Sequence, residues 1–195
     1  MQVLVVLAHP NDDSLNHSIA AVACTALRDA GHDVDLLDLY ALGFGAAMSR
    51  EEREAYHSGM PVLDPMVAEH ADLVRRAEAL VFVYPTWWSG LPAILKGWIE
   101  RVLVPGVAFT FNDRGKVRPG LGHVRHLVGI STYGSPWSAV KFVNDNGRRT
   151  ILRTVRLNTG TGTATKWFGL YRVDTATAQD RTAFIRKVER RMRSL

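Results

Sequence analysis

Short, uninterrupted apolar runs restrict the fold of this chain more than any other feature of its sequence. Val3–Leu7 and Ala79–Tyr84 contain no charged residue, which is the pattern of strands buried on both faces of a parallel sheet. Three further strands are expected at Val34–Leu39, His126–Ser131 and Thr163–Tyr171. Apolar residues at helical spacing fill the segments between these runs, so the chain alternates strand and helix.

Helix signals mark the intervening segments. They are Ser14 before a helical pattern that stops at Gly31, the capping box Ser49–Glu52, Asp64-Pro65, Pro92, and a closing helix with Phe184, Val188, Met192 and Leu195. Strands that alternate with helices predict a doubly wound α/β fold, a five-stranded parallel sheet of order 2-1-3-4-5 with helices on both faces. No repeat or linker interrupts the pattern, so residues 1–195 are expected to form one domain.

Composition excludes several classes of protein. Hydrophobic residues make up 47% and charged residues 22% of the chain, which excludes extended disorder and collagen-like structure. The single cysteine, Cys24, permits no internal disulfide and indicates a reducing compartment. Met1 is followed by no signal-peptide pattern, and no apolar stretch has the roughly 20 residues of a membrane span. A soluble, cytoplasmic protein is therefore expected.

The formal net charge of +5 raises the question of a polyanionic partner. Much of the excess lies in two clusters, the first at Arg148, Arg149, Arg153 and Arg156, and the second at Arg186, Lys187, Arg190, Arg191 and Arg193. Neither is interleaved with aromatic residues and no nucleic-acid recognition module is present, so a solvated helical face is the preferred interpretation and no nucleic acid is expected. A small anionic ligand stays open.

The segment after the first strand has the chemistry of a phosphate site. His9, Ser14 and Asn16 provide hydroxyl, amide and imidazole groups beside an expected helix start, where exposed N–H groups favour anions. Neither a G-x-G-x-x-G fingerprint nor a Walker lysine is present. Taken alone, Ser14 is equally well explained as an ordinary helix N-cap.

Aromatic residues follow the third and fourth strands. Trp87 and Trp88 stand in a loop bracketed by prolines and a glycine, and neighbouring side chains cannot both enter one core, so at least one is expected to line a cleft. Ser131–Gly134 and Trp137 follow the fourth strand. Because the carboxyl ends of parallel strands share one edge of the sheet, a phosphorylated planar cofactor fits, and a flavin fits best.

Four motifs give these residues a specific resemblance. They are V-L-A-H-P-x-x-D-S-L-N-H, D-L-Y-A-L-G-F followed by M-S-R-E-E, Y-P-T-W-W-S-G-L-P-A-I-L-K-G-W-I-E-R-V, and I-S-T-Y-G-S. Over nearly the whole chain the sequence resembles the NAD(P)H:quinone oxidoreductase (DT-diaphorase-like) family of flavodoxin-like flavoproteins, which includes ancillary oxidoreductases of bacterial potassium-efflux systems. The resemblance implies a flavodoxin-like fold, a flavin, a homodimer, and two-electron, ping-pong reduction of quinones or similar flat acceptors by NAD(P)H.

The resemblance also assigns residues to the flavin. His9, Ser14, Leu15 and Asn16 match the phosphate loop, Pro85, Thr86, Trp87 and Trp88 match the loop along the isoalloxazine ring, and Ser131, Thr132, Tyr133 and Gly134 match the loop at its pyrimidine edge. Backbone N–H groups of residues 132–134 are expected to donate there. The short chain favours FMN over FAD. It does not distinguish NADH from NADPH, nor identify the physiological acceptor.

The sequence departs from the family where acid–base assistance is expected. A tyrosine and a histidine after the fourth strand are replaced by Trp137 and by Val143-Asn144, and the substrate wall carries Phe109 and Phe111 without hydroxyls. The expected substrate pocket therefore consists of Phe109, Phe111 and Trp137, with no assigned catalytic side chain and Tyr133 and Trp137 as candidate contributors. Apolar quinones should be preferred, with little pH dependence between about pH 6 and 8.

The dimer contact implied by the resemblance lies around Trp98, Leu103 and Val104–Phe111, an apolar stretch too long to face the sheet entirely. The alternative is that this stretch packs within its own chain.

Two other functions are open. Ala8-His9-Pro10-Asn11-Asp12 resembles the A-H-P-D-D motif of zinc-dependent deacetylases, but Asn11 occupies the base position, and His123 and His126 precede the fourth strand. No metal is therefore assigned. A non-enzymatic electron carrier, or a regulatory subunit peripherally associated with a membrane transporter, is the second alternative; the basic charge argues against the carrier.

Overall fold

Five parallel strands form the central sheet, in the order β2-β1-β3-β6-β7. The computed structural model describes residues 1–195. The strands are β1 (Gln2–Leu7), β2 (Asp33–Asp38), β3 (Ala79–Pro85), β6 (His126–Thr132) and β7 (Ala164–Leu170). Because β6 and β7 are the fourth and fifth strands of the sheet, the order 2-1-3-4-5 is confirmed. No predicted strand end is misplaced by more than one residue.

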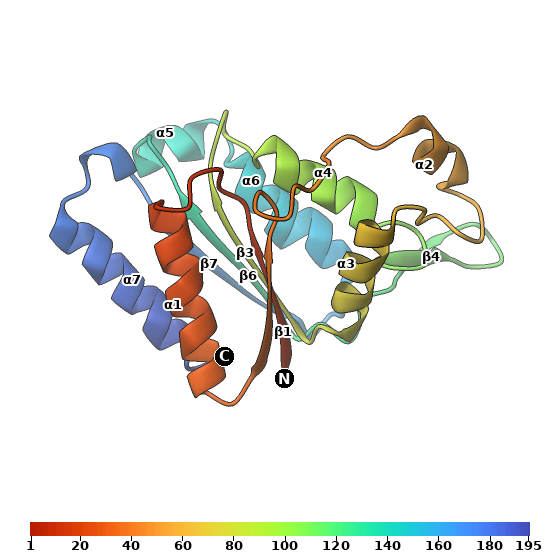
Figure 1. Ribbon diagram of the computed structural model, residues 1–195, viewed down its shortest axis with the longest axis horizontal. Helices are drawn as coiled ribbons and strands as arrows, with labels where there is room; N and C mark the ends of the chain where they lie inside the picture. Colours follow the sequence, from red (N-terminus) through yellow and green to blue (C-terminus); the bar gives the residue numbers. More distant parts are fainter.

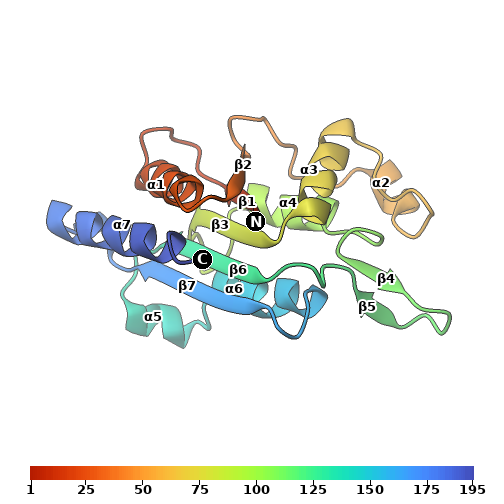
Figure 2. The same cartoon turned by 90° about the horizontal axis from the view of Figure 1, so that it is seen from below.

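Helices cover both faces of the sheet (Figures 1 and 2). They are α1 (Leu15–Asp29), α2 (Arg50–Ala55), α3 (Pro65–Arg76), α4 (Ala93–Val102), α5 (Trp137–Phe142), α6 (Asn146–Arg149) and α7 (Ala178–Met192). Two separate apolar cores result. Side chains of α1 and α7 fill one of them, and side chains of α3, α4 and residues 151–155 fill the other.

The predicted helix signals act as expected. Ser14 caps α1 by accepting from the N–H of His17, and Ser49 and Glu52 form the capping box of α2. Gly31 follows α1 with φ 83°, a conformation that favours glycine over residues with a Cβ. Cys24 is buried on α1, as expected for a core residue.

Two segments have structure that the apolar pattern does not reveal. A short hairpin, β4 (Phe109–Phe111) with β5 (Val117–Pro119), projects from the edge of the molecule (Figure 2). Beyond α6, a π-helical turn at Thr150–Thr154 and 3-10 turns at Val155–Asn158 and Val173–Thr175 complete the helical elements. In the first basic cluster, Arg148 and Arg149 lie on α6, Arg153 on the π-helical turn and Arg156 on the 3-10 turn that follows.

The apolar stretch expected at a dimer contact mostly packs within its own chain. Trp98, Leu103, Val104 and Val107 are buried in the core beside α3 and α4. These four residues therefore pack within their own chain, which was the alternative to a dimer contact, and the dimer itself stays a prediction. Among the aromatic residues of this stretch, Phe109 at the hairpin is half-buried and Phe111 is exposed.

No helix of the protein combines the length and the apolar character that crossing a membrane requires.

Candidate functional site

Three loops meet at the carboxyl edge of the sheet, joined by direct hydrogen bonds. The Thr86 N–H donates to the carbonyl of Thr132 at 2.8 Å, and the Thr86 and Ser131 hydroxyls lie 2.8 Å apart. Thr132 Oγ1 donates to Asn16 Oδ1 at 3.0 Å. The ends of β1, β3 and β6 thus form one continuous site, as the strand order requires.

The loop after β1 presents unpartnered donors. The N–H groups of Leu15 and Asn16 have no acceptor in the protein, as is usual in the first turn of a helix. Asn16 is 2% exposed, and its Nδ2 amide group has no hydrogen-bond partner. A buried donor without a partner is costly unless a ligand accepts from it, so this loop has the form of an anion cradle.

His9 and Ser14 have a different part in that loop. The His9 ring lies 6.2 Å from the rings of both His17 and Trp87, which brings the first loop to the second. Burial lowers the pKa of His9, so this ring is mostly neutral at pH 7. The Ser14 hydroxyl is occupied by His17, whose backbone N–H and ring Nδ1 it meets at 3.2 and 2.9 Å. Ser14 is therefore at least an N-cap.

Trp87 and Trp88 line a pocket of about 700 Å³ with Tyr133, Gly134 and Val143. We call it the aromatic pocket, or the Trp87–Tyr133 pocket. Trp88 is fully exposed, and Trp88 and Ser89 have φ values of 48° and 57°. This conformation is strained for residues with a Cβ and recurs at ligand sites. The carbonyl of Ser89 accepts from the N–H of Asn146 at 3.1 Å, which fixes the strained loop to the start of α6.

Tyr133, which lines this pocket, has a buried partner, Asp145, that the sequence analysis missed. Tyr133 donates its hydroxyl to both carboxylate oxygens of Asp145 at 3.1 Å, and its ring stacks on Tyr171 with centroids 4.7 Å apart. Burial raises the pKa of the Asp145 carboxyl and of the Tyr133 hydroxyl. Asp145 stands before the helical Asn146–Arg149 segment, where an aspartate is an N-cap signal.

The expected backbone donors are only partly available. The N–H of Tyr133 donates to the carbonyl of Leu170 at 2.8 Å, so it is occupied within the fold. The N–H of Gly134 has no acceptor in the protein. Of these two groups, Gly134 is therefore the one free to donate to a ligand.

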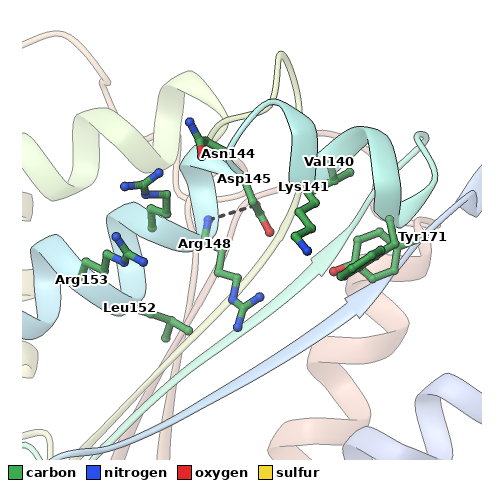
Figure 3. Close-up of a pocket in the computed structure, with 10 residues that line it drawn as sticks. Val140, Lys141, Asn144, Asp145, Arg148, Leu152, Arg153 and Tyr171 are labelled. Carbon is green, nitrogen blue, oxygen red and sulfur yellow. Dashed lines mark hydrogen bonds between the residues drawn. The ribbon is translucent and has the colours of Figure 1, made fainter.

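A second pocket, of about 380 Å³, is lined by Asp145, the hydrogen-bond partner of Tyr133, among other residues (Figure 3). Lys141 and Tyr171 stand on one side of it, and Arg148, Leu152 and Arg153 on the other. Trp137 lines this second pocket and not the Trp87–Tyr133 pocket. We call it the basic pocket, because Lys141, Arg148, Arg149 and Arg153 line it with Asp145 as the one carboxylate.

Within one chain, the three residues of the expected substrate pocket do not come together. Phe109 and Phe111 stack edge-to-face on the hairpin, with ring centroids 5.7 Å apart, and Phe111 lies 6.0 Å from His57. Neither lines the Trp87–Tyr133 pocket or the basic pocket. Trp137 is therefore separated from Phe109 and Phe111.

One group of metal-ligating side chains comes together near the first loop, but the histidines that the zinc alternative needs do not. Asp12, His17 and Asp38 offer atoms within 4.8 Å of one another, but His17 Nε2 is engaged with Asp38 at 2.8 Å and Asp12 is exposed. His126 begins β6, at the amino end of the strands, whereas His9 follows β1 at the carboxyl end. The separation predicted between these histidines is confirmed.

Comparison with known proteins agrees with the fold. A family model described as flavodoxin-like fold matches residues 1–191. The chain belongs to the flavodoxin-like fold family. Its relatives include NAD(P)H:quinone oxidoreductases, which agrees with the resemblance carried by the sequence motifs.

NAD(P)H dehydrogenase [quinone] 1 of Rattus norvegicus is 34% identical over 152 residues, which cover 69% of this chain and 54% of the relative. The chain thus spans about half the length of that relative. The solved NAD(P)H:quinone oxidoreductase from Methanothermobacter marburgensis is 25% identical, with a TM-score of 0.82 over 100% of this chain and 96% of that one.

An FMN-dependent NADH-azoreductase from Bacillus anthracis, solved with FMN, has a TM-score of 0.76 over 98% of both chains. At 12% identity it shares the fold alone. Solved structures of this fold thus include FMN complexes.

Proposed function

We propose that the protein is a flavin-dependent NAD(P)H oxidoreductase that reduces quinones or similar flat acceptors. The observation that supports this most strongly is the junction of an anion cradle with an aromatic pocket. The unpartnered Asn16 amide and the free N–H groups of Leu15 and Asn16 stand at one end. The pocket of Trp87 and Tyr133 stands at the other, joined to the cradle through Thr132 and Thr86.

The residues present fit a flavin. The buried Asn16 Nδ2 and two backbone N–H groups suit a phosphate, and a pocket of about 700 Å³ lies within the range of small-molecule sites. A bound flavin would supply hydride chemistry, accepting from a reduced nicotinamide and donating to an acceptor. The protein would bind the phosphate through Leu15 and Asn16, hold the ring beside Trp87, and donate one hydrogen bond from the Gly134 N–H.

The compact chain is compatible with FMN more readily than with FAD, and fold relatives include FMN complexes. Mass spectrometry of the cofactor released from purified protein tests this choice: release of FAD alone would contradict it.

We further propose a homodimer in which the hairpin of one copy covers the aromatic pocket of the other. The separation of Phe109 and Phe111 from Trp87 within a single chain supports this arrangement, because the substrate wall implied by the resemblance then comes from the partner. The proposed enzyme activity is compatible with peripheral association with a membrane transporter, as the resemblance to ancillary oxidoreductases of potassium-efflux systems suggests.

The phosphate assignment is tested by Asn16→Asp, which brings a carboxylate against a bound phosphate. Loss of a charge-assisted contact together with like-charge repulsion should weaken flavin binding by at least about tenfold. Asn158→Asp is the matched control, because Asn158 ends the 3-10 turn before β7, at the amino end of the strands and away from the three loops of the site, and its amide donates only to the Thr154 carbonyl. Flavin fluorescence titration measures both. Unchanged affinity in Asn16→Asp would remove the phosphate from this loop.

Catalysis is tested by steady-state turnover of NADH and NADPH with a naphthoquinone by the flavin-loaded protein. Parallel double-reciprocal lines are expected, since both substrates would use the Trp87–Tyr133 pocket in turn. Flavin binding without turnover would favour the carrier or regulatory alternative.

A further inference from the structure

The basic pocket has an unbalanced charge that the fold does not neutralise. Four cations line it, Lys141, Arg148, Arg149 and Arg153, against one carboxylate, Asp145. Asp145 is occupied by the Tyr133 hydroxyl and by the backbone N–H of Arg148. None of the four cations takes part in an ion pair of the protein. Like charges gathered in a recess without counterions favour an anionic ligand.

Flat side chains accompany these charges. The Lys141 ammonium lies 5.0 Å from the ring centre of Trp137, and the Arg148 guanidinium 5.8 Å from that of Trp167. Trp137 and Tyr171 line the pocket. Aromatic planes beside cations suit a ligand that carries both a flat ring and a phosphate.

The basic pocket adjoins the aromatic pocket. Val140 lines both, and the hydrogen-bonded Tyr133 and Asp145 lie one on each side. The anion cradle after β1 is on the opposite side, because β3 and β6 separate β1 from β7 in the sheet. A phosphate bound by the cradle would therefore lie apart from the basic pocket, which leaves that pocket for the second substrate.

We propose that the basic pocket binds the 2′-phosphate-bearing adenosine half of NADPH and so selects NADPH over NADH. This inference rests on the proposed function, which puts the nicotinamide in the Trp87–Tyr133 pocket. Arg148, Arg149 and Arg153 bind the phosphate monoester, and Trp137 or Tyr171 stacks on the adenine. Guanidinium groups suit phosphate oxygens because their paired N–H donors match them.

Direct binding to the flavin-free protein tests the pocket without any catalysis. Calorimetric titrations use adenosine 2′,5′-bisphosphate, adenosine 5′-monophosphate and inorganic phosphate as the three probes. The bisphosphate should bind at least about tenfold more tightly than either of the others, the value of one charge-assisted contact. Equal affinity for the two nucleotides would overturn the proposal, and equal affinity for phosphate and bisphosphate would reduce the pocket to a site for free phosphate.

Charge-neutral variants locate the contact. Arg148→Gln, and the pair Arg149→Gln with Arg153→Gln, should each lower bisphosphate affinity and the NADPH-to-NADH ratio of kcat/KM about tenfold. Asp145 caps α6 by accepting from the backbone N–H of Arg148, and none of the three arginine side chains forms a hydrogen bond or ion pair within the protein, so these variants should fold. Arg186→Gln on α7 is the matched control for lost positive charge and should bind as the parent protein does.

The outcomes separate the two proposals. If the protein binds flavin and turns over with an NADPH-to-NADH ratio near one, and the bisphosphate shows no preference, the basic pocket assignment is wrong while the proposed function stands. If the protein does not bind flavin, the proposed function is wrong; the titrations then still report whether the arginines hold a 2′-phosphate.

Discussion

Arg101 on α4 is a buried cation whose partners come from two other segments. Its guanidinium meets Glu52 at 2.7 Å and Asp64 at 2.8 Å, and Arg101 and Glu52 are each 8% exposed. This hydrogen-bonded ion pair holds α2 and the start of α3 against α4. It also keeps the pKa of Asp64 below its usual value.

Replacing Arg101 with methionine should lower the free energy of unfolding by about 3–5 kcal/mol, because Glu52 is left buried without its counterion. Urea denaturation measures this loss. Arg50→Met is the matched control: Arg50 pairs with Glu54 at the surface, where such a pair is worth about 0.5 kcal/mol or less. The added change Glu52→Gln should recover part of the stability, and failure to recover any would mean that packing, not charge, dominates.

His70 on α3 is a buried histidine whose ring nitrogen accepts a hydrogen bond from a core tryptophan. Trp98 Nε1 donates to His70 Nδ1 at 3.2 Å, and the His70 ring stacks on Phe44. His70 is 3% exposed, and burial lowers its pKa because the charged ring is disfavoured there. The folded protein therefore holds this imidazole neutral as acceptor for Trp98.

That arrangement predicts acid sensitivity. Below about pH 6.5 the unfolded chain binds a proton that folded His70 does not, so stability is lost as the pH falls toward the folded pKa. His70 alone contributes at most about 1.4 kcal/mol per pH unit. Denaturation at pH 7.5 and 5.5 should show a smaller difference in His70→Asn, which keeps an acceptor near Trp98 but does not titrate. An identical pH difference in both proteins would exclude His70 as the source.

Among the elements, α4 approaches the loop after β2 so closely that only glycine fits. A Cβ on Gly97 would lie 2.1 Å from the carbonyl oxygen of Ala46. Gly97→Ala should therefore destabilise the protein by about 1–3 kcal/mol, although alanine favours helix formation. Gly162→Ala, where a Cβ meets nothing within 4 Å, should change stability by no more than about 0.5 kcal/mol. A neutral Gly97→Ala would show that the loop can move away.

The elements differ in how far the sequence predicts them. The strands follow from uninterrupted apolar runs, which are typical of strands buried on both faces of a sheet, and the long helices follow from helical spacing and N-caps. The bounds of the strands agree with the structure because polar residues, glycine or proline stand at or close to both ends of each run. The hairpin strands at Phe109–Phe111 and Val117–Pro119 are three residues each, too short for any period to show.

The site divides in the same way. Convergence of His9, Trp87 and Thr132 follows from strand order, whereas Asp145 and Tyr171 meet Tyr133 only through packing of distant segments. From the sequence, the arginines at positions 148, 149 and 153 are interpreted as a solvated helical face. The π-helical turn at Thr150–Thr154 departs from the α-helical period that such a reading assumes.

At the scale of the whole molecule, the exposed hairpin predicts self-association. Phe111 and Val117 are 46% and 58% exposed on paired strands, and the proposed dimer covers this face. Sedimentation at micromolar concentration should show a dimer, and Phe111→Glu should shift it toward monomer through burial of an unpaired charge. Flavin binding should persist in that variant while quinone turnover falls. A fully active monomeric parent protein would rule out the shared site.

The dimer also bears on acceptor choice. Phe109 and Phe111 offer apolar planes without hydroxyls, so an alkyl-substituted naphthoquinone should be reduced with higher kcat/KM than a small hydrophilic benzoquinone, at about 25 cal/mol per Å² of apolar area buried. Competition between the two acceptors measures the preference. A preference for the hydrophilic quinone would contradict an apolar wall.

Four left-handed residues, Trp88 and Ser89 in the aromatic pocket and Asn144 and Asp145 in the basic pocket, have a consequence for laboratory evolution. Glycine relieves such backbone strain, so selection for heat resistance alone should enrich Ser89→Gly and Asn144→Gly. The Ser89–Asn146 hydrogen bond joins both strained turns, and slackening either turn loosens the walls of both pockets. Thermostable descendants of this protein would then accumulate substitutions in the walls of both pockets, where they are expected to lower catalytic efficiency.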